Sequence, residues 1–599
     1  MQLSDIAEAS SLVGLFLDRA DELGDKPFLT AKTDAGWTPI SWREAARQVC
    51  AVAASLRTMG LADGDRVLIV SENRPEWAIA DLAIMAAGCI TTPAYITNTE
   101  GDHRHILSDS GARAVIVSTA KLAQPLLRAM IRSGKAEHLI AVEPLGAAQA
   151  GGFARHSWAN LVTGGDAGAE REAVDERLAS TSRDDLACII YTSGTSGAPR
   201  GVMLHHGAIL SNVQAAAEAL TRDFGWDEER FLSFLPLSHA LEHTAGLMLP
   251  IALGAEIWFA EGLDKLSTNL AEARPTLMIV VPRLFELLRT RIMKQVEKDG
   301  ALPQFLLRQA VRIGESRLDG ADRWRDIPVN LLLDRTIRPR IAERFGGRIK
   351  ALVSGGAPLN PEVGAFFSGL GLTMLQGYGQ TETAPVISCN IPSAGIRLRT
   401  VGPPLGDAEV RIAEDGEILV RGPLVMKGYW QSPQETARAL HDGWLHTGDI
   451  GHLDAGGRIM ITDRKKDLII NDKGDNIAPQ KLEGMLTLQP EIAQAMVAGD
   501  KRPYVVALIV PDAEWSREWA GANGVAADPA KLAANGAFVG AIKVAIERTN
   551  ADLSVTEKIR KFILADAPFT VEAGEMTPTL KIRRHALGAR YGERLDALY

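Results

Sequence analysis

Several patterns that identify common protein classes are missing from this sequence. Its 599 residues include only four cysteines, which lie far apart and form no CxxC pair, so we expect neither a disulfide framework nor a cysteine zinc site. The cysteines stand in apolar segments, and such reduced thiols favour a cytoplasmic location. There is no long basic block and the net charge is −9, which argues against a nucleic-acid-binding protein.

The sequence also lacks a hydrophobic stretch long enough to span a bilayer. The longest uncharged apolar run, at 245–255, is short and interrupted by Pro250, whereas a spanning helix needs about 20 apolar residues. The N-terminal segment carries acidic residues early and has no basic region, so we do not expect a signal peptide. Peripheral contact with a membrane surface remains open.

The overall composition is that of a globular protein, with 46% hydrophobic and 23% charged residues. A chain of this length is expected to form more than one domain. Helix-like and strand-like runs alternate between residues 10 and 120, with buried strands at 66–70 and 114–117, which predicts a mainly parallel α/β sheet. Residues 145–183, rich in Ala, Gly, Asp and Glu, are interpreted as a surface linker.

The pattern changes in the last third of the chain. Residues 400–462 read as short strands, with a hairpin at Asp415–Gly416, and predict a β-barrel-like subdomain. We therefore expect an α/β protein whose large N-terminal domain, 1–462, combines α/β subdomains with this barrel. A short charged junction at 463–467 would lead to a small α+β C-terminal domain at 468–599, which again mixes strands and helices.

The most informative segment runs from Tyr191 to Gly201 and reads YTSGTSGAPRG. An apolar run at 186–190 predicts a buried strand before it, and a helix is expected at about 207–220. A glycine-rich turn between strand and helix aims N–H groups at an anion, and hydroxyls and Arg200 add donors. This predicts a phosphate cradle; a solvated Ser/Gly loop is the alternative. The P-loop pattern of nucleoside triphosphatases does not fit, because Pro199 stands where it requires glycine.

Two further motifs each have a structural and a functional interpretation. Residues 354–359, SGGAPL, are either a plain strand-to-helix turn or a place where backbone approaches a ligand closely. Residues 375–383, LQGYGQTET, place Tyr378 between two glycines as a stacking platform. Thr381 then offers a hydroxyl to phosphate and Glu382 a hard oxygen ligand to Mg²⁺. A tyrosine turn before an acidic helix start is the alternative.

Three charged residues in the last third of the chain have a predicted function only if a nucleotide binds nearby. Asp449 follows a tight turn in the sequence WLHTGD and is either a turn residue or a carboxylate for a ribose diol. Arg464 is then a further contact for the ribose or for a phosphate. Lys581, in the loop-like segment MTPTLKIRR, is otherwise explained as part of a solvated basic tail.

Taken together and in this order, the motifs resemble those of the acyl-adenylate-forming superfamily, the AMP-binding enzymes, over residues 12–590. Within it the chain is most similar to bacterial long-chain fatty-acyl-CoA synthetases. The motif LPLSHALEH at 235–243, the long helix-rich stretch between 281–286 and Ser354, and the ending TPTLK at 577–581 carry this closer likeness.

The resemblance implies a long-chain fatty acid–CoA ligase. It would form acyl-AMP and pyrophosphate from a fatty acid and ATP with Mg²⁺, and then acyl-CoA and AMP with coenzyme A. The implied catalytic residues are Lys581, Thr195, His239 and Glu382. The implied Mg²⁺ ligands are Glu382 and Thr195. The acyl and coenzyme A channel would be lined by His239, Gly379 and Gly474, and Lys466 would be the hinge about which the C-terminal domain rotates between the two steps.

The same resemblance implies the ATP site. Tyr378 would stack on adenine with Gly356 and Ala357 opposite, Asp449 would hold the ribose, and Lys581 would reach the carboxylate and the α-phosphate. The full set of ATP contacts would be Thr192, Ser193, Gly194, Thr195, Ser196, Gly197, Arg200, Gly355, Gly356, Ala357, Gln376, Gly377, Tyr378, Gly379, Thr381, Asp449, Arg464 and Lys581.

The chain departs from the family pattern at two positions. The phosphate loop usually ends in Pro-Lys-Gly, but here Arg200 replaces the lysine; arginine keeps the charge and can bind two phosphate oxygens. Ser196 replaces the usual threonine and keeps the hydroxyl. Neither change suggests a dead enzyme, because Lys581, Glu382 and Asp449 are all present.

Three alternatives stay open. A fatty-acyl-AMP ligase that loads a carrier protein and a synthetase for aryl or shorter acids belong to the same superfamily, and tunnel shape would decide between substrates. A non-catalytic nucleotide- or lipid-binding protein is the alternative of another class, although Lys581 argues against it. The expected partner is a fatty acid, without nucleic acid; transient membrane contact is expected because long-chain acids partition into membranes, and a homodimer is left open.

Overall fold

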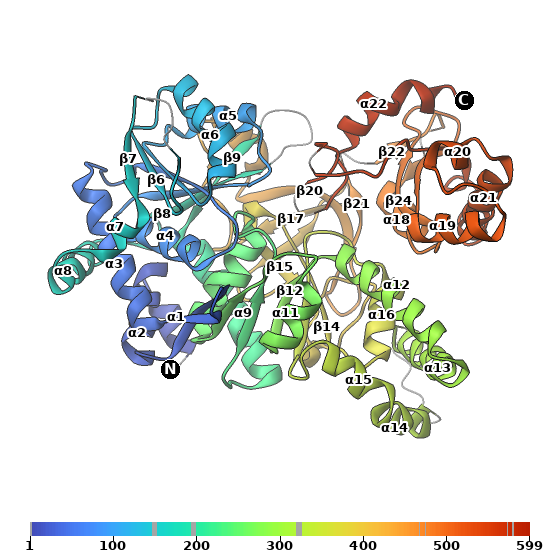
Figure 1. The fold of residues 1–599 in the computed structure, drawn as a ribbon, viewed down its shortest axis with the longest axis horizontal. Helices are drawn as coiled ribbons and strands as arrows, with labels where there is room; N and C mark the ends of the chain where they lie inside the picture. The colour runs from blue at the N-terminus through green and yellow to red at the C-terminus, as the bar shows by residue number, and fades with distance from the viewer. Residues whose placement is uncertain are drawn as a thin grey trace.

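Two large sheets form most of the protein. The computed structural model describes residues 3–146, 152–192, 199–318, 326–465, 468–473, 475–571, 573–577 and 580–599. Two eight-stranded sheets, a five-stranded sheet and a three-stranded sheet contain most of its strands. In Figure 1 the first half of the chain lies at the left and centre, and the C-terminal helices and strands gather at the right.

One large sheet contains most strands of the first 205 residues, together with β18 from much later in the chain. Its order is β18-β9-β8-β4-β3-β5-β6-β7, and the pairs from β8 to β7 are parallel. This confirms the predicted α/β arrangement, including its strands at 66–70 and 114–117. The strands are β3 (Arg66–Val70), β4 (Ile90–Ala94), β5 (Ala114–Val117), β6 (His138–Ala141), β7 (Ala154–Ser157), β8 (Leu186–Thr192), β9 (Arg200–His205) and β18 (Gly428–Tyr429).

The second large sheet is also mainly parallel. Its order is β15-β14-β13-β12-β10-β11-β1-β2, with antiparallel pairs only at β14–β15 and β1–β2 among the described strands. The strands are β1 (Pro27–Thr33), β2 (Gly36–Ser41), β10 (Arg230–Ser233), β11 (Glu256–Phe259), β12 (Leu277–Val280), β13 (Ala351–Ser354), β14 (Met374–Gly379) and β15 (Val386–Cys389).

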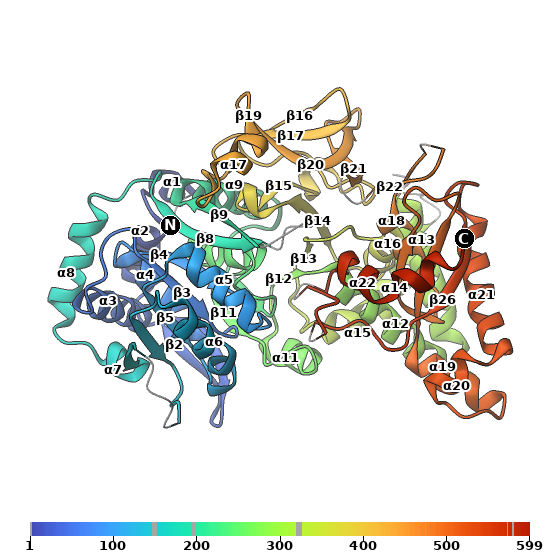
Figure 2. The same cartoon turned by 90° about the horizontal axis from the view of Figure 1, so that it is seen from above.

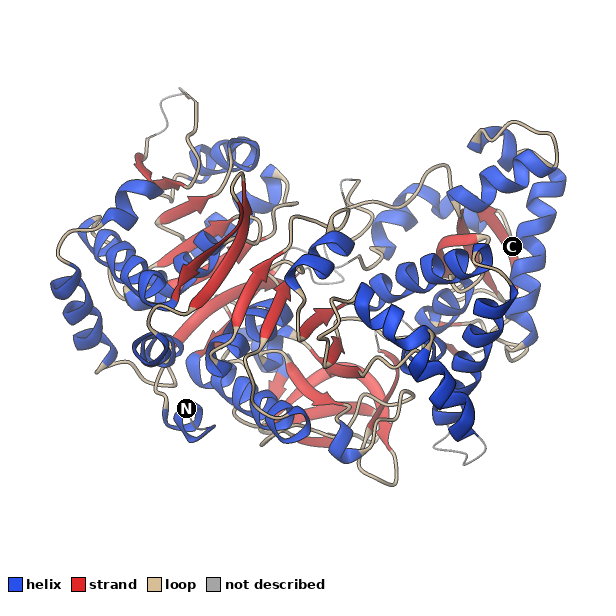
Figure 3. Ribbon diagram, turned by 60° about the horizontal axis from the view of Figure 1, so that its bottom comes forward, coloured by secondary structure: helices blue, strands red, loops and turns tan. Residues whose placement is uncertain are grey.

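Helices cover the sheets, as Figure 3 shows. One continuous apolar core includes residues of both large sheets, such as Val67 and Ile257, and residues of the helices between them, such as Leu210. Burial of these side chains stabilises both sheets together. The helices include α3 (Trp42–Thr58), α4 (Pro75–Ala86), α5 (Glu100–Ser110), α9 (His206–Phe224), the π-helix η1 (Glu242–Met248), α12 (Pro282–Lys298), α13 (Ala301–Leu318) and α16 (Pro361–Gly369).

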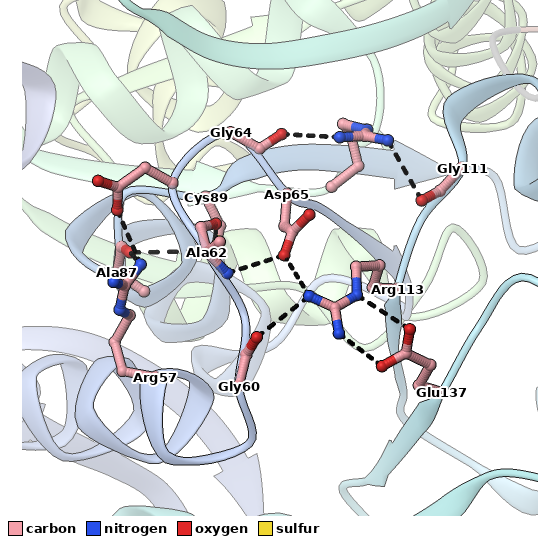
Figure 4. A network of polar contacts seen from close by, with 12 residues as sticks. Arg57, Gly60, Ala62, Gly64, Asp65, Ala87, Cys89, Gly111, Arg113 and Glu137 are labelled. Atoms are coloured by element: carbon pink, nitrogen blue, oxygen red, sulfur yellow. Dashed lines mark hydrogen bonds and ion pairs between the residues drawn. The ribbon is translucent and has the colours of Figure 1, made fainter.

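Ion pairs fasten the first large sheet at the amino ends of its parallel strands. Arg113, just before β5, contacts Asp65 at 2.7 Å and Glu137 at 2.6 Å, and donates to the carbonyl of Gly60 at 3.1 Å. Figure 4 shows this network joining the segments before β3, β5 and β6. The carboxyl ends of the same strands therefore remain available for binding.

The last third of the chain forms the two smaller sheets. The predicted hairpin at Asp415–Gly416 joins two antiparallel strands, and the expected barrel-like element is a five-stranded sheet whose described pairings follow an open path. Figure 2 shows this sheet on one side, between the two halves of the molecule. The strands are β16 (Glu409–Ile412), β17 (Glu417–Arg421), β19 (Leu440–His441), β20 (Trp444–Leu453) and β21 (Ile459–Arg464). The C-terminal sheet is β24 (Ile492–Ala498), β25 (Val505–Pro511) and β26 (Ile559–Leu564).

The predicted linker at 145–183 is wrong in its described part. That part contains β7, α7 (Trp158–Thr163) and α8 (Ala167–Leu178). Asp166 caps α8, and Arg171 on this helix pairs with Asp21 at 2.9 Å. The Ala- and Glu-rich composition that suggested a linker is also a good helix-forming composition. Across the described residues, no helix has the length and apolarity needed to cross a membrane.

Candidate functional site

The predicted site motifs meet at the carboxyl ends of parallel strands. The Ser/Thr/Gly loop follows β8, the SGGAPL turn follows β13, and Tyr378 stands near the end of β14. The LPLSH segment follows β10 in the same sheet as β13 and β14. Ligands of open α/β sheets bind at this edge, so the fold brings together motifs that are far apart in the sequence.

The structure changes the account of the phosphate loop. Thr192 at the end of β8 pairs with Arg200 at the start of β9 in an antiparallel register, so the loop joins two strands. The helix predicted at about 207–220 is confirmed as α9 (His206–Phe224). Strand β9 lies between the loop and this helix, so the helix N-terminus does not follow the loop directly. Residues Ser193, Gly194, Thr195, Ser196 and Gly197 lie outside the described residues, and their roles stay predictions.

Arg200 faces two residues that the sequence did not single out. Its guanidinium pairs with Glu435 at 2.8 Å, at the start of α17 (Pro433–Ala439), and lies 4.6 Å from the ring centroid of Tyr429. The Tyr429 hydroxyl donates to Oε1 of Glu382 at 2.8 Å. Burial and the Glu382 charge raise the pKa of Tyr429 above its ordinary value. Arg200 and Glu382 are thus linked through one aromatic ring.

Tyr378, Asp449 and Arg464 form a chain of contacts across two sheets. The Tyr378 hydroxyl donates to Oδ2 of Asp449 at 2.7 Å, and Nε of Arg464 donates to Oδ1 at 2.8 Å. Burial, followed by the Asp449 charge, raises the pKa of Tyr378 well above its ordinary value. The interpretation of Asp449 as a loop residue is wrong: it lies inside β20, opposite Arg464 in β21.

Two buried polar atoms beside Tyr378 have no hydrogen-bond partner among the described residues. They are the hydroxyl of Ser354 and the side-chain oxygen of Gln376, which lie opposite each other on β13 and β14. A buried polar atom without a partner is costly unless a ligand or water satisfies it. The predicted nucleotide residues Gly355, Gly356 and Ala357 follow Ser354 directly, so the orphaned atoms lie at the predicted adenine site.

His239, in the segment after β10, lies close enough to Lys581, in the C-terminal part of the chain, for their charges to interact. Burial and the positive charge of Lys581 lower the pKa of His239 to about 4, so the imidazole is neutral near pH 7. The N–H of Leu241 donates to its Nδ1 at 3.1 Å, which leaves the proton on Nε2. Lys581 lies in a short turn where its N–H donates to the hydroxyl of Thr577 at 3.0 Å.

A second electrostatic interaction, between Tyr95 and Arg583, also links the large N-terminal part of the chain to the C-terminal part. Tyr95, just after β4, is buried strongly enough to raise its pKa, and Arg583 opposes that rise through its charge. Tyr95 belongs to no motif noted in the sequence, whereas Arg583 lies in the segment MTPTLKIRR. The C-terminal segment from Lys581 to Arg583 therefore approaches both large sheets.

The other predicted residues occupy the same region. Gly377 and Gly379 flank Tyr378 in β14, and Thr381 and Glu382 lie in a short 3₁₀ turn, Thr381–Thr383. Lys465, within the predicted hinge 463–467, contacts Asp415 at 2.6 Å and Glu417 at 3.2 Å. Lys466 and Gly474 lie outside the described residues. The predicted boundaries at 462 and 467 stay predictions.

Glu382 has the chemistry of a magnesium ligand. Its carboxyl accepts the one hydrogen bond from Tyr429 described above, and a carboxylate offers several lone pairs. Within the described ranges, no group of three or more His, Cys, Asp or Glu side chains is placed to hold a metal ion. Mg²⁺ usually takes only one or two carboxylates and completes its shell with phosphate oxygens and water, so the residues present fit this ion.

The chain matches two family models. Residues 16–430 match the AMP-binding enzymes, and residues 466–599 match the C-terminal domain of AMP-binding enzymes. A Mycobacterium tuberculosis protein named long-chain-fatty-acid–CoA ligase FadD15 is 34% identical over 94% of this chain and 93% of its own length. The Arabidopsis thaliana peroxisomal long chain acyl-CoA synthetase 7 is 29% identical over 99% of this chain and 87% of its own.

Solved structures show the same fold. The adenylation domain of a carboxylate reductase from Mycobacterium chelonae superposes with a TM-score of 0.77 at 22% identity, covering 100% of this chain and 92% of that one. The corresponding domain from Segniliparus rugosus, solved with AMP and a co-purified carboxylic acid, gives a TM-score of 0.76 at 21% identity over 100% and 95% of the two chains.

Proposed function

Because the chain belongs to the family of AMP-binding enzymes, we propose that it activates a long-chain fatty acid with ATP and transfers the acyl group to coenzyme A. The carboxylate attacks the α-phosphorus of ATP to form acyl-AMP and release pyrophosphate. The thiol of coenzyme A then attacks the acyl carbonyl, and AMP leaves. The names of the two curated relatives support the substrate class, and the approach of Lys581 to His239 is the observation that carries the proposal.

The nucleotide would bind where the two large sheets and the five-stranded sheet approach one another. The ring of Tyr378 would stack on adenine, with the backbone of Gly356 and Ala357 opposite. The orphaned oxygens of Ser354 and Gln376 would face the polar edge of the base. Asp449, already held by Arg464, would accept hydrogen bonds from the ribose diol.

Charge neutralisation would provide most of the catalysis of the first step, because phosphoryl-transfer chemistry depends on positioning and electrostatics. The loop from Thr192 to Arg200 would hold the pyrophosphate part of ATP. Lys581 would contact both the carboxylate and the α-phosphate, whose negative charges otherwise repel each other. Glu382 and Thr195 would hold Mg²⁺, which screens the phosphate charges when bound.

The second step would use another face of the C-terminal domain. His239, Gly379 and Gly474 would line the junction between the acyl tunnel and the coenzyme A channel. The domain 468–599 would rotate about Lys466 in the hinge 463–467, relative to the domain 1–462. All of these residues come from one chain, so the proposal does not require a homodimer. We place the reaction in the cytoplasm with transient membrane contact, where long-chain acids partition.

Mass spectrometry of the products tests this proposal directly. The protein would be incubated with ATP, Mg²⁺, coenzyme A and an equimolar set of fatty acids from short to very long chains. A long-chain acyl-CoA formed together with AMP supports the proposal. Acyl-AMP that accumulates without thioester would indicate the carrier-protein ligase, and a short or aryl product would indicate the other synthetase. Absence of AMP would indicate a binding protein.

The variant Lys581→Ala supplies the matching control for the chemistry. Loss of one charge-stabilising donor should slow acyl-AMP formation by about 10²-fold or more. Lys531→Ala removes an exposed lysine of the helix Pro529–Ala533 in the same C-terminal part and should leave the rate unchanged. Pyrophosphate release at the normal rate in Lys581→Ala would contradict the assignment.

A further inference from the structure

The segment that carries His239 is held by a side chain from the other large sheet. Asn73, which follows β3, donates from Nδ2 to the carbonyl of Leu235 at 2.6 Å and to the hydroxyl of Ser233 at 3.0 Å. Its Oδ1 accepts from the N–H of Leu237 at 3.0 Å. The side-chain amide of Asn73 thus uses its N–H groups and its oxygen to bind the stretch from Ser233 to Leu237, which leads to His239. Asn73 and Leu235 are 162 positions apart in the chain.

The same stretch is also held on its other side, by Glu242. The Ser233 hydroxyl donates to Oε1 of Glu242 at 2.6 Å. Glu242 is buried, with only 1% of its surface exposed. The space for this carboxyl depends on Gly246, because a Cβ there would lie 2.5 Å from the carboxyl carbon. The contacts from Asn73 through Ser233 to Glu242 therefore hold the stretch between the segment after β3 and the π-helix η1.

These contacts determine where the imidazole of His239 lies. The backbone N–H of His239 donates to the carbonyl of Pro236 at 2.9 Å, and its ring Nδ1 accepts from the N–H of Leu241. A methyl group of Leu241 lies 3.1 Å from the place that a Cβ of Gly355 would occupy. A shift of the stretch would therefore move His239 and would also change the packing against the predicted adenine site.

We propose that Asn73 is a positioning residue that holds the LPLSH segment so that His239 meets the acyl group and the incoming thiol. It acts only through the backbone of Leu235 and Leu237 and through Ser233, and it is assigned no contact with a substrate. This inference rests on the proposed function, in which His239 lines the junction of the acyl and coenzyme A channels.

A double-mutant cycle tests the inference. Acyl-CoA formation and pyrophosphate exchange would be measured for the wild type, Asn73→Ala, His239→Ala and the double variant. We expect Asn73→Ala to lower kcat/KM for the fatty acid in acyl-CoA formation by about tenfold, with KM for ATP changed by less than about twofold. On the His239→Ala background, Asn73→Ala should add less than about twofold, because both changes remove the same function. Losses that simply multiply would overturn the inference.

Two further variants separate positioning from folding. Asn73→Asp keeps an oxygen for the N–H of Leu237 and loses both donors, so it should reproduce the kinetic loss even if the alanine variant is too unstable to assay. Asn550→Ala is the matched control. It removes an amide that bonds the carbonyl and N–H of Ile559 at 3.0 and 2.9 Å, on α21 (Gly536–Ala551), which lies among the C-terminal elements at the right of Figure 1. It should lower the melting temperature and leave kcat/KM unchanged.

The outcomes distinguish this inference from the proposed function. A wild type that makes no acyl-CoA refutes the proposed function itself. An active wild type with a fully active His239→Ala refutes the role of His239 and this inference with it. An active wild type, an impaired His239→Ala and a fully active Asn73→Asp refute the inference alone.

Discussion

The hydroxyl of Tyr378 and the carboxylate of Asp449 lie 2.7 Å apart, although 71 residues separate them in the chain. Asp449 is only 3% exposed, and its other oxygen is held by Arg464. A buried carboxylate with donors on both oxygens is fixed in orientation before any ligand arrives. This contact ties the second large sheet to the five-stranded sheet at the place where we expect the nucleotide.

Tyr378→Phe is expected to weaken nucleotide binding. The ring remains, but Asp449 loses one donor, and an unsatisfied buried group costs about 1–3 kcal/mol. KM for ATP in pyrophosphate exchange should therefore rise by roughly 5- to 150-fold. Tyr504→Phe is the control, because its hydroxyl donates to the carbonyl of Leu598 at 2.9 Å in the C-terminal part. An unchanged KM for ATP in Tyr378→Phe would refute the role of this pair.

The two glycines beside Tyr378 should respond differently to alanine. A Cβ on Gly379 would lie 1.8 Å from the carbonyl oxygen of Pro385, whereas on Gly377 the nearest atom would be 3.5 Å away. Gly379→Ala must move backbone and should cost roughly 3 kcal/mol of unfolding free energy. Gly377→Ala should cost less than about 1 kcal/mol. Urea denaturation of the two variants measures the difference, and equal midpoints would contradict the predicted steric cause.

An ion pair between α12 and the C-terminal part should favour the orientation that brings Lys581 to His239. Nζ of Lys294 lies 2.6 Å from Glu514 and 3.9 Å from Asp512, and Arg283 donates to the carbonyl of Ala493 at 2.5 Å. Because the pair is partly exposed, its effect is small. Lys294→Glu should slow acyl-AMP formation by about two- to fivefold and should not slow thioester formation from supplied acyl-AMP.

Charge exchange provides the control for this prediction. The double variant Lys294→Glu with Glu514→Lys restores opposite charges and should recover acyl-AMP formation, and added salt should reduce the difference between variants. Equal slowing of both half-reactions in the single variant, or no recovery in the double variant, would show that the ion pair does not act on domain orientation.

The free energy of unfolding should fall on mild acidification because of buried histidines. Burial lowers the pKa of His103 to about 4, below the ordinary value of 6.5. The unfolded chain therefore takes up a proton below pH 6.5 that the folded protein accepts only near pH 4. The folded state is destabilised progressively over this window, by about 3 kcal/mol at most for this residue.

Substitution of His103 provides the measurement. His103→Leu cannot titrate, so its urea midpoint should fall less steeply than that of the wild type between pH 6.5 and 5. His452→Gln replaces an exposed histidine and should keep the wild-type slope. Identical slopes for His103→Leu and the wild type would refute the contribution.

Local signals in the sequence predicted many elements of the fold and named the residues of the candidate site, whose roles stay predictions. The strands at 66–70 and 114–117 were identified by short apolar runs, and the hairpin at Asp415–Gly416 by its turn residues, because burial pattern and turn chemistry are local properties. Two of the predictions that failed involved strand pairing, which the local sequence does not show. The phosphate loop leads into a strand because β9 pairs with β8 and β18, and Asp449 belongs to a strand because β21 pairs with β20.

The sequence by itself determined the chemistry of this protein: the hydroxyl-rich loop, the tyrosine between glycines, the acidic residues and Lys581 are all readable along the chain. Only the tertiary structure decided which groups act together. The contacts of Asn73 with Leu237 and of Tyr429 with Glu382, and the electrostatic interaction of Lys581 with His239, join segments whose separation in the chain carries no periodic signal. They form because parallel strands of separate sheets end at a common edge, and that edge exists only once the sheets have packed.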